Sequence, residues 1–178
     1  MQDQSQHYAE LSAWGSWAAV GCALLIVWLQ NRSAKRLTCL ELFIQLAAQY
    51  DSVDMQNIRG RLADRLLTDP TTLEIEDSLL VFFENVAILA RRNLLDRELV
   101  WNTFSFDMPI YWCALRHYVE HSRNEFSEPS LFEEFEKLVE TFLKTERSPM
   151  GTRLKHQPLS ETAVLDFLRY ESLRGAKP

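Results

Sequence analysis

A single carboxylate, Glu84, lies inside the most apolar stretch of the sequence that follows residue 34. It stands next to Asn85, between Leu79 and Ala90, where nearly every other side chain is aliphatic or aromatic. An ionised carboxylate without a partner is costly in such surroundings. Burial also raises the pKa of an acid toward the range that suits a general base. The chemistry that Glu84 could supply is therefore proton transfer in a pocket.

Glu84 also has a structural interpretation, in which it is a buried acid bound to a hydrogen-bond donor elsewhere in the fold. The candidate donors are the guanidinium groups of Arg61 and Arg116 and the indole N–H groups of Trp101 and Trp112. We expect this structural role rather than catalysis, and the four donors stay open as alternatives.

Cys113, His117 and His121 recur at every fourth position and would share one face of a helix. Two such groups can share a metal ion, but residues eight positions apart are about 12 Å distant along a helix axis. A zinc site would need further ligands from other elements. A Cys113–His117 nucleophile pair would lack a third group to orient it. We therefore expect surface histidines here, and we predict no bound metal and no cofactor.

The arginines Arg59, Arg61 and Arg65 could bind a phosphate or an acidic partner. Pairing with nearby acids such as Asp64 and Asp69 is the simpler expectation, and it places all three arginines on a solvated face. The sequence contains no Gly-rich phosphate loop, no GxSxG and no HExxH motif. Its net charge of −6 argues against a nucleic-acid partner, which should meet a basic surface.

Aromatic residues crowd the segment between positions 101 and 112. Core packing accounts for most of them, but one or two left exposed would form a patch that binds a partner. The residues are Trp101, Phe104, Phe106, Tyr111 and Trp112. This segment is the main support in the sequence for an interaction role.

Apolar residues follow helical spacing throughout the part of the chain after residue 34, and no segment alternates with the period of a strand. We expect an all-α fold, a bundle of about five or six helices. Residues 34–146 should form the domain, 147–159 a linker, and 160–178 a C-terminal helix and tail. The expected helices cover a first segment at about 37–47, then residues 54–67, 73–92, a turn at 96–101, 107–123, a segment from about 130, and 160–173. Thr71 and Glu74 are predicted to form a capping box that opens the second of these.

An uncharged run from Leu11 to Leu29 precedes the domain and is long enough to cross the roughly 30 Å core of a bilayer. We predict a transmembrane helix at residues 11–30 behind a short extracytoplasmic segment, residues 1–10. Arg32, Lys35 and Arg36 follow the run, whereas no Lys or Arg precedes it, so the domain should face the cytoplasm.

Three alternatives to this topology are weaker. A cleavable signal peptide would need a basic segment before the apolar run and a small-residue cleavage site after it, and the sequence has neither. A surface-lying helix would need a polar face that the run lacks, and lipidation at Cys22 would need a basic segment ahead of it. Within the run, Gly15, Ala19 and Ala23 form a ridge of small residues through which two such helices could associate.

The segment around the predicted central helix resembles a bacterial family known as Domain of Unknown Function 4760. The elements that carry the resemblance are Phe82-Phe83-Glu84, Asn93-Leu94-Leu95-Asp96, Trp101 to Phe104, and Tyr111-Trp112, within residues 38–145. The resemblance implies an all-helical domain behind an N-terminal membrane helix. It implies no activity, cofactor or functional residue.

These features favour a membrane-tethered interaction or regulatory module of the bacterial inner membrane, anchored in the lipid bilayer and binding a protein partner or itself. We predict that five residues are buried polar groups or contacts to a partner: Glu84, Asn85, Trp101, Trp112 and Arg116. The alternative is a small enzyme or ligand-binding domain that uses Glu84 in a pocket.

Overall fold

A computed structural model describes residues 25–30, 34–144 and 160–175. The chain divides into two compact units, Met1–Glu41 and Leu42–Pro178. Every regular element in the described ranges is a helix, which confirms the all-α class. In the first unit, residues 25–30 and 34–41 are helical, and in the second unit residues 42–50 are helical.

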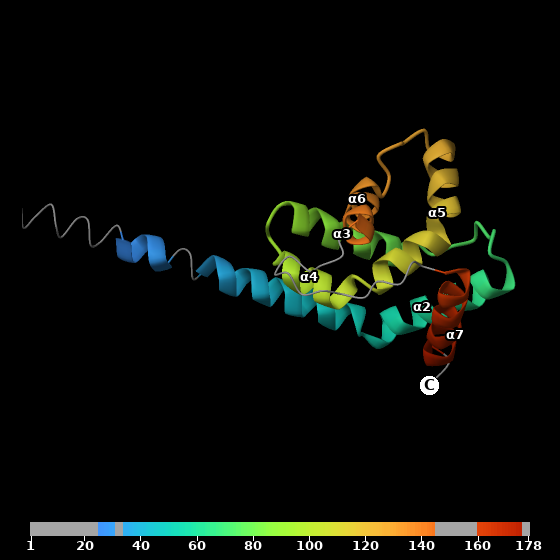
Figure 1. Cartoon of the computed structure of the whole chain (residues 1–178), viewed down its shortest axis with the longest axis horizontal. Coiled ribbons are helices and arrows are strands. Elements are labelled where there is room, and N and C mark those ends of the chain that lie inside the picture. The colour runs from blue at the N-terminus through green and yellow to red at the C-terminus, as the bar shows by residue number, and fades with distance from the viewer. Residues whose placement is uncertain (1–24, 31–33, 145–159, 176–178) are drawn as a thin grey trace, which may run out of the picture. The chain divides into compact units, whose positions relative to one another are not determined.

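Within its described residues, the second unit contains six further helices (Figure 1). They are α2 (Val53–Thr68), α3 (Ser78–Arg91), α4 (Arg97–Phe104), α5 (Asp107–Glu125), α6 (Glu133–Lys144) and α7 (Glu161–Gly175). α6 packs chiefly on α3, and α7 packs across α2. The last two helices in the described part of the chain, α6 and α7, thus pack mainly on α3 and α2 respectively.

Local capping explains where several helices begin. At the start of α2, the Ser52 hydroxyl accepts a hydrogen bond from the backbone N–H of Met55. At the start of α4, the Asp96 carboxylate accepts from the backbone N–H groups of Glu98 and Leu99. The Ser160 hydroxyl accepts from the N–H of Ala163, as expected for the first turn of the final helix. Each cap satisfies a backbone donor that the helix itself leaves without a partner.

The capping box predicted for Thr71 and Glu74 is wrong. Asp69 accepts hydrogen bonds from both the backbone N–H and the hydroxyl of Thr71, at 2.9 and 2.7 Å, so this segment forms a local turn. α3 then begins only at Ser78. Asp69 accepts from the Thr71 N–H, and the Thr72 hydroxyl accepts from the Glu74 N–H, so both donors of the predicted capping box have other partners.

The core of the unit is rich in aromatic rings. Phe83 of α3 is fully buried, and its ring stacks on Phe135 of α6 with 5.1 Å between centroids. Phe83 also contacts Tyr111 of α5 and Tyr50, at 5.8 Å in both cases. The most apolar predicted helix is thus the one around which the others gather, as its sequence indicated.

No helix within the described residues is both long and apolar enough to cross a membrane. Of the predicted span at residues 11–30, only residues 25–30 are described. The ridge of Gly15, Ala19 and Ala23, the segment 1–10 and the linker 147–159 lie outside the described ranges.

Candidate functional site

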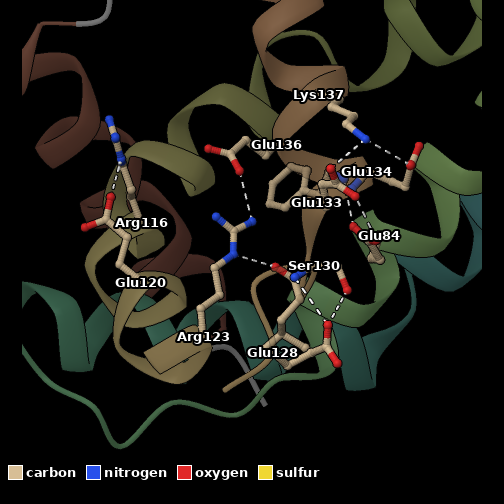
Figure 2. Close-up of polar contacts among 12 residues, drawn as sticks. Glu84, Arg116, Glu120, Arg123, Glu128, Ser130, Glu133, Glu134, Glu136 and Lys137 are labelled. Carbon is tan, nitrogen blue, oxygen red and sulfur yellow. Dashed lines mark hydrogen bonds and ion pairs between the residues drawn. The ribbon is translucent and has the colours of Figure 1, made fainter. Parts of the chain in front are cut away.

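Glu84 joins two helices. Its carboxylate accepts hydrogen bonds from the backbone N–H groups of Phe135 and Glu134, at 2.7 and 3.3 Å, in the first turn of α6 (Figure 2). The first N–H groups of a helix have no partner within it, and the helix dipole favours a negative charge there. Glu84 of α3 therefore caps α6 from outside.

The donors to Glu84 are main-chain groups and not the arginines proposed from the sequence. Arg61 pairs with Glu76 and Arg116 with Glu120, both at 2.8 Å. The side chain of Glu84 is half-buried, and burial raises the pKa of its carboxyl group. The geometry gives Glu84 a structural role that ties α6 to α3.

The other residues singled out from the sequence do not converge with Glu84 on one site. Asn85 and Arg116 are exposed, whereas Trp101 and Trp112 are buried in the core. Trp101 packs edge-on against Phe142, and Trp112 packs in the same way against Phe135. Both indoles hold α6 in place.

Cys113 and His121 are exposed, while the Nε2 atom of His117 lies 3.2 Å from the carbonyl oxygen of Thr72. In the part of the chain that the structure describes, no group of three His, Cys, Asp or Glu side chains is placed to hold a metal ion. His117 instead links α5 to the turn before α3.

Arg59 departs from its predicted position on a solvated face. Its side chain is only 1% exposed, and its Nε atom lies 2.9 Å from the Oε2 atom of Glu171, which is 3% exposed. Arg61 and Arg65 do lie on the surface. Because Glu171 belongs to α7 and Arg59 to α2, a buried ion pair connects segments far apart in the sequence.

Two tyrosines and a second acid extend this ion pair into a buried polar cluster, defined as Tyr50, Arg59, Asp107, Tyr111 and Glu171. The Tyr111 hydroxyl donates to Glu171 at 3.1 Å, and the Tyr50 hydroxyl donates to Asp107 at 2.5 Å. The guanidinium carbon of Arg59 lies 4.0 Å from the centre of the Tyr50 ring. Four helical segments thus meet at one group of polar side chains.

The electrostatics of the cluster are dominated by burial. Burial raises the pKa of the Asp107 carboxyl, an effect that the Tyr50 hydroxyl and the charges of Arg59 and Arg174 only partly offset. Burial also raises the pKa of Glu171 despite its contact with Arg59. Both acids are therefore less stable as anions here than they would be in water.

A pocket of about 470 Å³ opens beside the cluster, between the start of α5 and one face of α7. Its lining consists of Phe106, Asp107, Ala163, Asp166, Phe167, Tyr170, Glu171 and Arg174. Phe106 and Tyr170 are 61% and 58% exposed. The pocket therefore combines an aromatic rim with carboxylates, and α7 supplies most of its wall.

The model of the family described as Domain of unknown function (DUF4760) matches residues 16–142. The chain belongs to this family. No curated protein and no solved structure matches the chain significantly. The match extends from the predicted membrane segment into α6, whereas α7, which carries Glu171 and most of the pocket, follows the matched residues.

The sequence analysis missed Glu171 and the burial of Arg59. One local signal was present, because Gly60 follows Arg59 inside α2, where a glycine lowers helix stability. A Cβ atom on Gly60 would lie 2.7 Å from the Cα atom of Gly175, so the two helix backbones touch at this point. The mid-helix glycine marked a close helix crossing, and the arginine before it was part of that crossing.

Proposed function

We propose that this member of the family is a membrane-tethered interaction module whose helical domain binds a partner protein on the cytoplasmic side. The observation that carries the proposal is the position of Phe106. In the aromatic segment at residues 101–112, Trp101, Phe104, Tyr111 and Trp112 are buried, whereas Phe106 is largely exposed at the pocket.

An exposed phenylalanine next to a second exposed aromatic, Tyr170, is typical of a surface that becomes buried in a complex. Phe106 is held in place by an edge-on contact with Phe167, with 5.9 Å between the ring centroids. A ring that is already positioned loses little conformational freedom on binding. These contacts support a docking role for the rim of the pocket.

The tether is supported by the apolar run that continues into the described residues. Leu25, Ile26, Val27, Trp28 and Leu29 are consecutive and helical, and each is between 49% and 60% exposed within the chain. A helix that is apolar on all sides requires an apolar environment around it. A bilayer supplies that environment, and Lys35 and Arg36 then lie on its cytoplasmic side.

Site-specific photocrosslinking in cells tests the docking surface. A photoreactive phenylalanine analogue placed at position 106 of the full-length chain should crosslink to a discrete protein. The same analogue at Phe126 provides a matched control, because Phe126 is 68% exposed at the far end of α5 and does not line the pocket. Identical crosslinks from both positions, or none from position 106, would contradict the proposal.

A further inference from the structure

We infer that the pocket beside Phe106 receives a basic side chain of the partner protein, with Asp107 as its anion and Phe106 and Tyr170 as its aromatic walls. This inference rests on the proposed docking function and specifies the chemistry of the partner. An arginine side chain fits best, because its planar guanidinium both stacks on aromatic rings and binds a carboxylate.

The charges in the pocket favour a cation. The lining contains three carboxylates, Asp107, Asp166 and Glu171, and one guanidinium, that of Arg174. The charge of Glu171 is compensated by Arg59. Asp166 pairs with Arg169 at 3.1 Å, but both side chains are exposed, so water weakens this attraction. Asp107 is left as the carboxylate that a bound cation would neutralise.

Asp107 has unused capacity to accept hydrogen bonds. Within the described ranges, the Tyr50 hydroxyl is its one hydrogen-bond donor, and it contacts only the Oδ2 atom. No described cation lies within ion-pair distance of this carboxylate, although the charges of Arg59 and Arg174 act on it. An ionised carboxylate accepts several hydrogen bonds, so a guanidinium entering the pocket could bind it directly.

The rim suits the rest of an arginine side chain. A cation near an aromatic face is attracted by the ring, and the attraction grows as water is excluded. The aliphatic stem of an arginine can meanwhile cover the rings. Arg174 lies in the same pocket and would compete with the incoming cation for Asp107. Removing the Arg174 charge should therefore strengthen the binding of an arginine side chain. The binding of an apolar side chain would not depend on this charge.

Two small probes test the inference on the full-length protein in mild detergent. The first is N-acetyl-arginine amide, whose only charge is its guanidinium, and the second is the isosteric, neutral N-acetyl-citrulline amide. Saturation-transfer NMR should show at least tenfold tighter binding of the arginine probe. Asp107→Asn should reduce its affinity at least tenfold, Arg174→Gln should increase it, and Phe126→Ala should leave it unchanged.

Equal affinity for both probes, or no binding of either, would overturn the inference. If Asp107→Asn fails to fold, the probe pair on the wild-type protein and the Arg174→Gln variant still decide the matter. The docking function is judged separately by the crosslink from position 106. A crosslink that persists in Asp107→Asn, together with equal binding of the two probes, would retain the docking surface and eliminate the basic side chain.

Discussion

Glu84 and Asp107 are two acids inside the same helical domain, but their surroundings differ. Glu84 accepts from two main-chain N–H groups at the start of a helix, whereas Asp107 accepts from one phenol. Main-chain donors at a helix N-terminus favour the ionised form of an acid more strongly than a single hydroxyl does. Glu84 is therefore satisfied within the fold, and Asp107 has room for a further partner.

Replacing Glu84 should weaken the attachment of α6. Glu84→Ala removes the cap from the N–H groups of Glu134 and Phe135, and we expect a loss of about 1–2 kcal/mol in the free energy of unfolding. Glu84→Gln keeps one acceptor oxygen and should cost less. Urea denaturation measures both changes, with the exposed neighbour in Asn85→Ala as the control. An Ala variant as stable as the wild type would contradict the capping role.

Asp107 should make the domain less stable as the pH rises. Because its pKa is raised in the folded state, the folded protein holds a proton at pH values where the unfolded chain has lost it. Its stabilising contribution is complete below the ordinary pKa of 3.8 and is lost as the pH rises through the raised value. Asp107→Asn should therefore show a flatter stability profile than the wild type as the pH rises above 3.8.

The groups that face Asp107 are Tyr50, Arg59, Arg174 and Asp51. None of the four is altered in Asp107→Asn, but the Asp107 charge also raises the pKa of Glu171, so the difference between the two profiles reports Asp107 together with its effect on Glu171. Urea denaturation at a series of pH values provides the measurement. Parallel profiles for the two proteins would mean that the pKa of Asp107 is not raised.

At the scale of the elements, a buried ion pair and a close contact between two glycines hold α7 against α2. The buried pair of Arg59 and Glu171 lies next to the point where Gly60 and Gly175 touch. Buried ion pairs contribute little net stability, but removing one partner leaves a charge without compensation. We therefore expect the ion pair to determine how α2 and α7 align, while it adds little to the net stability of their contact.

Single and double substitutions test this account of the ion pair. Glu171→Leu alone leaves the Arg59 charge buried, and we expect it to cost about 3–5 kcal/mol. The double variant with Arg59→Met should recover most of that loss, because both charges are then gone. Thermal denaturation of the single and double variants decides between coupling and additivity. Additive losses would show that the two side chains act independently.

For Gly60→Ala, helix propensity and the close contact with α7 predict opposite changes in stability. In an ordinary helix interior, replacing Gly by Ala stabilises by roughly 0.5–1 kcal/mol. Here the new Cβ would lie 2.7 Å from the backbone of Gly175, so α7 has to shift. We expect a net loss of about 1–3 kcal/mol and faster amide hydrogen exchange in α7. A stabilised protein with a protected α7 would exclude the close crossing.

Gly175→Ala is the reciprocal variant. Its Cβ would lie 2.6 Å from the Cα atom of Gly60, so the same change in hydrogen exchange should follow. A shared response of the two variants would locate the effect at the crossing and not in the helix propensity of α2 alone.

Local signals in the sequence predicted the helices well, because periodicity and caps lie within a few residues of each other. The ranges 54–67 and 107–123 are examples, since α2 and α5 lie within two residues of these bounds. The partner of Glu84 was not predictable in the same way, because it is main chain on a distant helix. The pairing of Arg59 with Glu171 depends on how α7 packs: Gly60 indicates a close helix crossing next to Arg59, but no local pattern identifies the acid that lies opposite it. In the sequence, Arg59 could not be distinguished from the nearby Arg61 and Arg65, yet Arg59 is buried and the other two are exposed.

At the scale of the whole molecule, the family match is continuous from residue 16 to residue 142. It covers part of the apolar run as well as most of the helical domain. The chain carries a net charge of −6, yet Arg32, Lys35 and Arg36 are gathered directly after the apolar run. Such a cluster of positive charge in an acidic chain fits the proposed orientation, in which these residues stay on the cytoplasmic side of a membrane.

The orientation can be tested on the full-length chain with a reporter fused after Pro178. We expect activity from a reporter that works only in the cytoplasm, and no activity from one that works only in the periplasm. Replacing Arg32, Lys35 and Arg36 by glutamate should reduce or invert this preference, because retained positive charge sets the direction of insertion. Replacing Arg91, Arg92 and Arg97 in the same way provides a control of equal charge far from the apolar run. Periplasmic activity of the unaltered fusion would overturn the orientation, and recovery of the chain in the soluble fraction would overturn the tether itself.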